Sequence, residues 1–233
     1  YLLFKLLYLL SMTSGAKMSD INRRFNDEEE RMKLLHIKVS PNLQGSSSRN
    51  VSQQLLEKLQ SSYPKLTEQV LDLSAKPLPH LDALTTGAFL TKPEDRSFEQ
   101  NQAIQLSEQM VDMLLETDIL LLSSPMWNLG LPSVLKAWFD HITRAGRTFA
   151  FTKEGTKVGL VNNKKVYVVV SSGSCFSQER YVNDDQFTPY IKVALAYIGI
   201  EDVTFIRVDG THFPLTRDTA LPKALSAVDE LTV

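Results

Sequence analysis

The chain is poor in the residues that build disulfide-bonded and metal-bound frameworks. Among its 233 residues there are one cysteine, Cys175, and four histidines. A single cysteine excludes an internal disulfide and a site made of several thiolates, and no two histidines have the H-x-x-x-H spacing of a zinc enzyme. We therefore expect no metal site. Such cysteine usage suits a reducing compartment, so a cytoplasmic location is predicted.

The sequence also lacks a strong charge imbalance. Its 25 Lys and Arg and 27 Asp and Glu give a net charge of −2, which provides no reason to expect nucleic acid or an anionic membrane as a partner. The apolar stretch at residues 1–10 is too short to cross a bilayer, so no stable membrane insertion is expected. Its length fits the apolar core of a signal peptide. The alternative is that this stretch is a translated leader that takes no part in the fold. Residues 1–31 are thus predicted to be a disordered, targeting or non-native leader before one domain at residues 32–233.

From Met32 onward, strand and helix patterns alternate. Apolar runs typical of buried parallel strands lie at 34–39, 66–71, 119–124, 166–170 and 203–208. Residues 147–159 resemble a hairpin excursion. Five strands with intervening helices predict an α/β doubly wound parallel sheet. Because no G-x-G-x-x-G follows the first strand, the dinucleotide-binding version is disfavoured, and the flavodoxin-like order 2-1-3-4-5 is predicted.

A serine triplet, Ser46, Ser47 and Ser48, stands at a predicted helix start after the first strand. Hydroxyls and unpaired backbone amides at a helix N-terminus suit a phosphate, although serines also cap helices routinely. Since this is the carboxyl edge of the sheet, where such folds bind ligands, the phosphate interpretation gains support.

Two further loops follow strands at the same edge. Trp127 and Asn128 come after the third strand and offer a flat aromatic surface and a polar amide; a surface anchor and a turn former are the alternatives. The loop at 171–174 follows the fourth strand, and its small residues let a ring edge approach the backbone closely. Together the three loops predict a site for a planar, polar-edged heterocycle with a phosphate, such as a flavin nucleotide.

Several longer segments carry a family resemblance: PLPHLD at 77–82, PMWN at 125–128, FDHITRAGRTF at 139–149, GLVNNKK at 159–165, TPY at 188–190 and YIGI at 197–200. From Lys33 to its end the chain resembles the FMN-dependent NADH-azoreductases, relatives of the NAD(P)H:quinone reductases with the flavodoxin-like fold. The resemblance implies a homodimer with one tightly bound FMN per subunit, NADH or NADPH as co-substrate, and a quinone or azo compound as electron acceptor.

The resemblance also implies roles for three groups of residues. The FMN phosphate is held at Ser40, Ser46, Ser47 and Ser48; the isoalloxazine is bordered by Met126, Trp127, Asn128 and Leu129; its pyrimidine side is closed by Ser171, Ser172, Gly173 and Ser174. The family commonly has Arg-Gly-Gly at 172–174 and Phe at 129. Serine at 174 would be strained if the backbone φ were positive there.

The flavin carries the chemistry, so no side chain is predicted as a catalytic acid, base or nucleophile. We expect a two-electron ping-pong cycle of hydride transfer through flavin N5. Phe149 and Phe151 on the hairpin could stack on a planar acceptor or simply pack the hairpin. A flavodoxin-like electron carrier is an alternative that the near-neutral charge disfavours, and a non-catalytic, flavin-free domain of the same fold is another.

Overall fold

A computed structural model describes residues 31–233, so the predicted leader lies outside the described residues except for Arg31. Five strands form one sheet in the order β2-β1-β3-β6-β7, and every neighbouring pair is parallel. When only the five strands of this sheet are numbered along the chain, β6 is the fourth and β7 the fifth, so the predicted order 2-1-3-4-5 is confirmed. The strands are β1 (Lys33–Lys38), β2 (Thr67–Asp72), β3 (Ile119–Pro125), β6 (Lys165–Ser172) and β7 (Val203–Asp209).

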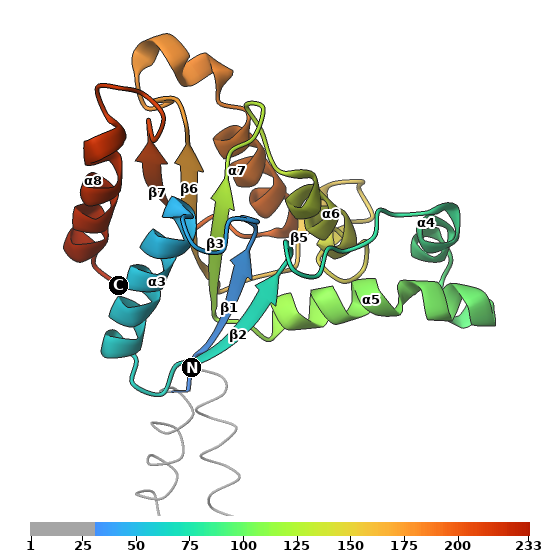
Figure 1. Cartoon of the computed structure of the whole chain (residues 1–233). Helices are drawn as coiled ribbons and strands as arrows, with labels where there is room; N and C mark the ends of the chain where they lie inside the picture. The colour runs from blue at the N-terminus through green and yellow to red at the C-terminus, as the bar shows by residue number, and fades with distance from the viewer. Residues whose placement is uncertain (1–30) are drawn as a thin grey trace, which may run out of the picture.

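Helices cover both faces of this sheet (Figure 1). On one face lie α3 (Ser47–Ser62) and α8 (Arg217–Glu230); on the other lie α5 (Phe98–Leu115), α6 (Ser133–Ile142) and α7 (Phe187–Ile198). Successive strand residues point to opposite layers: Leu121 packs with the α3 and α8 side, whereas Leu122 packs with the other. The central strands are apolar on both faces because both faces are buried.

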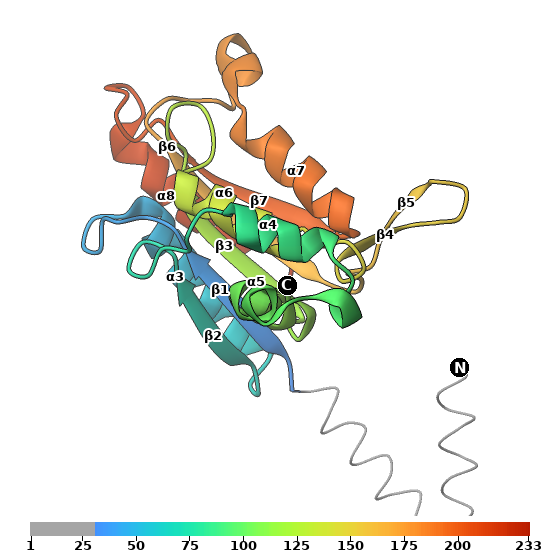
Figure 2. The same ribbon diagram turned by 90° about the vertical axis from the view of Figure 1, so that its right-hand side faces the viewer.

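The smaller elements lie outside these layers. They are α4 (Ala83–Leu90), the 3₁₀ helices η1 (Pro93–Asp95) and η2 (Glu179–Asp184), and the antiparallel pair β4 (Phe149–Phe151) and β5 (Lys157–Gly159). The β4–β5 pair is the predicted hairpin, which projects beyond the sheet in Figure 2. The sequence did not predict α4, which begins where the Asp82 carboxylate accepts a hydrogen bond from the amide of Thr85 at 2.7 Å.

The carboxyl ends of β1, β3 and β6 lie next to one another. The amide of Val39 donates to the carbonyl of Ser123 at 3.0 Å, and the amide of Met126 donates to the carbonyl of Ser171 at 2.7 Å. The loops that leave these three strands therefore share one edge, the upper one in Figure 1. In the described part of the chain, no helix is both long and apolar enough to cross a membrane.

Candidate functional site

The loop after β1 is shaped by its own polar side chains. Asn42 Oδ1 accepts hydrogen bonds from the amides of Gln44 and Gly45 at 3.2 and 2.9 Å, which turns the chain back toward the sheet. Ser46 then caps α3: its hydroxyl accepts a hydrogen bond from the amide of Arg49 at 3.3 Å and lies 3.1 Å from the Ser48 hydroxyl. The serine triplet thus does cap a helix, as the plainer interpretation held.

Capping does not use up the donors of this helix start. Within residues 31–233, the amides of Ser47 and Ser48 and the hydroxyl of Ser47 have no hydrogen-bond partner. They stand at the first turn of a 16-residue helix, where the helix dipole also favours an anion. The loop therefore keeps the groups that a phosphate requires. Ser46 and Ser47 also line a pocket of about 430 Å³ that reaches Leu221 of α8.

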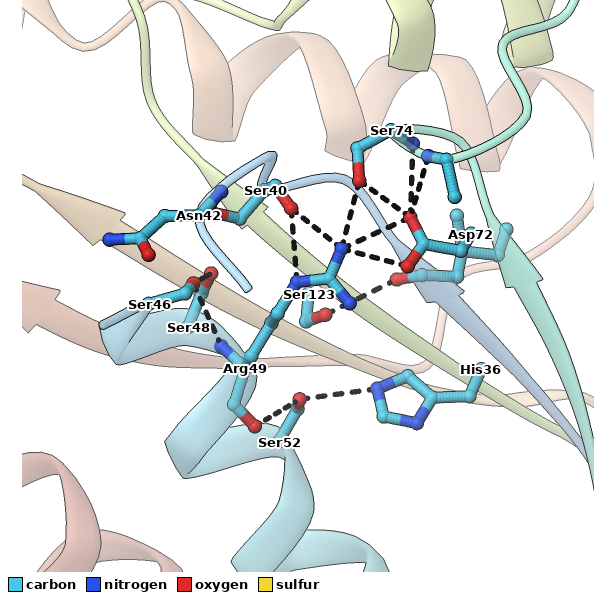
Figure 3. A network of polar contacts seen from close by, with 12 residues as sticks. His36, Ser40, Asn42, Ser46, Ser48, Arg49, Ser52, Asp72, Ser74 and Ser123 are labelled. Atoms are coloured by element: carbon cyan, nitrogen blue, oxygen red, sulfur yellow. Dashed lines mark hydrogen bonds and ion pairs between the residues drawn. The ribbon is translucent and has the colours of Figure 1, made fainter. Parts of the chain in front are cut away.

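An ion pair on the β2 side supports this loop. The Arg49 guanidinium bonds the carbonyl of Ser40, the carboxylate of Asp72 and the hydroxyl of Ser74 (Figure 3). Partial burial raises the pKa of Asp72, but hydrogen bonds from Ser74 and Arg49 outweigh burial and hold that pKa below its ordinary value. Asp72 is therefore ionised at neutral pH, and the pair is electrically balanced.

The segment after β3 forms a tight turn. Trp127 and Gly130 exchange backbone hydrogen bonds at 3.1 and 3.0 Å, and the two residues between them, Asn128 and Leu129, have φ of 48° and 70°. Positive φ at both central positions is typical of a type I′ turn. Trp127 is 47% exposed and Leu129 48%. Among the described residues, the amides of Asn128 and Leu129 have no acceptor, so the turn presents an exposed indole beside free donors.

The loop after β6 is held by the segment that follows β7. The Gly210 amide donates to the carbonyls of Ser172 and Ser174 at 3.0 and 3.1 Å, and the His212 amide donates to the carbonyl of Gly173 at 3.2 Å. All three carbonyls are thereby engaged. The amides of Gly173 and Ser174, in contrast, have no acceptor in the part of the chain that the structure describes. This loop consequently offers donors rather than acceptors to a ligand.

The structure brings all three predicted loops to one edge of the sheet. The predicted site residues differ in whether their side chains are exposed or buried. Ser40, Ser48 and Ser172 are buried, as is Met126 at 8% exposure. The Ser172 hydroxyl is engaged by the Ser174 carbonyl at 2.7 Å and by Asp209 at 2.8 Å, so its side chain points into the protein. The predicted contact of Ser172 with a ligand would therefore fall on its backbone.

The backbone φ of the loop after β6 decides whether Ser174 is strained. Ser174 does not have a positive φ, so it is not strained; among residues 31–233 the non-glycine residues with positive φ are Asn128, Leu129 and Asn163. Gly173 does not have a positive φ either. Its lack of a side chain matters for space instead, because an added Cβ would lie 3.1 Å from Nδ1 of His212.

The sequence pattern did not identify Arg49, Asp72 or the residues 210–212 as parts of the site. Arg49 directly follows the serine triplet, and that position was the one signal available. Asp72 and residues 210–212 reach the site only through the parallel pairing of β1 with β2 and of β6 with β7. No local motif marks them.

Known proteins resemble the chain over nearly all of its described length. A family model described as a flavodoxin-like fold matches residues 32–231. The FMN-dependent NADH:quinone oxidoreductase 2 of Hahella chejuensis is 64% identical over 202 residues, which cover 87% of this chain and 100% of that protein. The FMN-dependent NADH:quinone oxidoreductase of Beijerinckia indica is 40% identical over 200 residues, covering 86% and 98%.

Solved structures share the architecture. The azoreductase from Bacillus anthracis str. Sterne superimposes with a TM-score of 0.79 at 23% identity, covering 85% of this chain and 97% of that one. The FMN-dependent NADH-azoreductase from Bacillus anthracis str. Ames Ancestor, solved in complex with FMN, gives a TM-score of 0.76 at 23% identity and covers 85% and 96%. Likeness at this level of identity shows the fold alone.

Proposed function

The chain belongs to the family of FMN-dependent NADH:quinone oxidoreductases with a flavodoxin-like fold, and from this membership we propose that it reduces quinones and azo compounds with electrons from NADH or NADPH. It is an oxidoreductase, and its cofactor is FMN. Bound FMN would supply the redox chemistry, a two-electron hydride transfer at N5 from the nicotinamide and then to the acceptor in a ping-pong cycle.

The observation that carries the proposal is the donor set at the carboxyl edge. The amides of Ser47 and Ser48 at the start of α3 suit the dianionic phosphate, and those of Gly173 and Ser174 suit the carbonyl-bearing pyrimidine end of the ring. Trp127 follows β3, the strand between β1 and β6, and its exposed indole supplies an apolar surface. Donors at both ends and an aromatic surface between them fit the chemistry of FMN.

We assign the binding roles as follows. The phosphate would be held by Ser40, Ser46, Ser47 and Ser48, the ring would lie beside Met126, Trp127, Asn128 and Leu129, and its pyrimidine end would meet the backbone of Ser171, Ser172, Gly173 and Ser174. In the reaction these residues bind and orient. The free amides of Gly173 and Ser174 would stabilise negative charge at the ring edge, because preorganised backbone donors need no rearrangement as charge develops. No side chain is assigned a proton-transfer role.

We also propose that two copies associate. Leu90 on α4 is 90% exposed and Phe98 at the start of α5 is 72% exposed, and the two helices pack together. Large apolar side chains exposed on neighbouring elements are typical of an interface between proteins. A homodimer would cover them. The single cysteine further supports a reducing, cytoplasmic setting.

The proposal can be tested with the purified full chain. We expect a yellow protein whose flavin absorbance is bleached by NADH without oxygen and restored by a soluble benzoquinone, with parallel lines in double-reciprocal plots over both substrates. A yellow protein that NADH leaves oxidised would indicate an electron carrier. A colourless protein that FMN cannot reconstitute would indicate a non-catalytic domain, and either result would refute the proposal.

A further inference from the structure

Arg49 joins the two ends of the loop that follows β1. Its backbone stands in the first turn of α3, at the end of the loop, while its side chain returns to the beginning. There Nε and Nη2 donate to the carbonyl of Ser40 at 3.0 and 2.6 Å. A planar guanidinium that donates twice to one carbonyl fixes the direction of that peptide more tightly than a single donor can.

The same Nη2 also anchors the guanidinium to the end of β2. Nη2 lies 3.0 and 2.9 Å from the two carboxylate oxygens of Asp72 and 2.9 Å from the hydroxyl of Ser74. Asp72 is itself fixed, because its Oδ1 accepts hydrogen bonds from the amides of Ser74 and Ala75 at 3.0 and 3.2 Å and from the Ser74 hydroxyl at 2.7 Å. The loop is thus tied to a rigid point outside itself.

Arg49 is poorly suited to bind the phosphate through its charge. Figure 3 shows the guanidinium turned toward Asp72 and Ser74 and away from the hydroxyls of Ser46 and Ser48. The Arg49 side chain is 15% exposed and Asp72 23%, and the ionised carboxylate cancels the positive charge at short range. The Arg49–Asp72 ion pair therefore adds no free positive charge beside the serine donors. Its contribution is to fix the geometry of the loop.

We propose that Arg49 is a positioning residue, held by Asp72 and Ser74, that sets the conformation of the Ser40–Ser48 loop so that its donors converge on the phosphate of FMN. This inference rests on the proposed function. It goes further by separating the groups that contact the phosphate from the one that arranges them. Loss of the arrangement weakens binding of the phosphate while the contacts to the ring remain.

The test compares FMN with riboflavin, which has the same ring and no phosphate. The change is Arg49→Lys, which keeps the charge and removes the planar fork. We expect the Kd for FMN, measured by fluorescence titration of the full chain freed of flavin, to rise at least about 10-fold, the effect of losing one charged hydrogen bond. The Kd for riboflavin should change by less than about 3-fold.

Arg144→Lys is the matched control, because Arg144 also forms a carboxylate pair, with Glu108 at 2.8 Å, but contacts none of the three loops. It should leave both Kd values as in the wild type. Ser74→Ala removes one neutral hydrogen bond and provides a mild variant if Arg49→Lys fails to fold; it should weaken FMN binding about 3-fold and leave riboflavin binding unchanged.

Each outcome has a defined meaning. The positioning role is overturned if the Arg49→Lys protein binds FMN as the wild type does, or if it loses affinity for FMN and riboflavin equally. The same two outcomes apply to the Ser74→Ala protein where it takes the place of Arg49→Lys. Retention by the lysine variant would mean that charge alone suffices. A wild-type protein that binds neither flavin would refute the proposed function itself, which the wild-type titration reveals before any variant is compared.

Discussion

Acidification should destabilise the protein through one buried histidine. His36 lies on β1 and is fully buried, with Nδ1 at 2.8 Å from Glu68 Oε1 and Nε2 at 3.1 Å from the Ser52 hydroxyl. Burial lowers the pKa of His36 to about 4 from 6.5, although the hydrogen bond that its ring donates to the Glu68 carboxylate opposes this shift. The neutral ring is therefore the form that the folded protein favours.

The direction of the pH effect follows from the lowered pKa. Because the unfolded chain holds the His36 proton more tightly than the folded protein does, the free energy of unfolding falls as the pH drops from about 6.5 toward 4. Between pH 7.5 and pH 5 this one group should remove about 2 kcal/mol, and roughly 3 kcal/mol once the pH is below both pKa values. The full contribution is present above pH 6.5.

The assay is urea unfolding of the flavin-free full chain at pH 7.5 and pH 5, at one protein concentration. The informative variant is His36→Gln, whose amide does not titrate. It should be less stable than the wild type at pH 7.5, but its free energy of unfolding should fall less than that of the wild type between pH 7.5 and pH 5. His80→Gln changes an exposed histidine and should keep the wild-type loss. If His36→Gln loses as much stability as the wild type over this range, the pH dependence belongs to other groups and the reasoning is wrong.

Three further changes test other parts of the structure. Gly199→Ala should lower the free energy of unfolding, measured in urea, by about 2–3 kcal/mol. The reason is that Gly199 has a φ of 107° and an added Cβ would lie 2.8 Å from the carbonyl oxygen of Val161. An unchanged midpoint of urea unfolding would contradict this close approach of the two backbone segments. Arg144→Lys should lower the free energy of unfolding by about 1–3 kcal/mol, because the buried guanidinium donates to the Ser107 hydroxyl at 2.6 Å and a lysine cannot reproduce its planar set of donors. An unchanged free energy of unfolding would mean that the hydrogen bonds of Arg144 are dispensable for stability. Trp127→Ala should leave stability within about 0.5 kcal/mol and raise the KM for quinone in steady-state assays, whereas an unchanged KM would indicate that the exposed indole is only a surface anchor.

The sequence by itself determined the class of fold and the edge where the site lies. Apolar runs record burial on both faces, and the residues that follow each run mark the carboxyl end of a strand, so β1, β3 and β6 with their loops were predictable from local pattern. The serine triplet and the Trp127–Asn128 pair were visible for the same reason. Each of these signals lies within a few residues of its strand.

Only the tertiary structure decided how the site is held together. Arg49 meets Asp72 across 23 positions of sequence, and Ser172 turns its hydroxyl to Asp209 across 37. Such partners are set by strand order and register, which bring distant residues together without leaving a local motif. The positive φ of Leu129 is of the same kind. Leucine ordinarily avoids this conformation, and the reciprocal hydrogen bonds of the turn impose it.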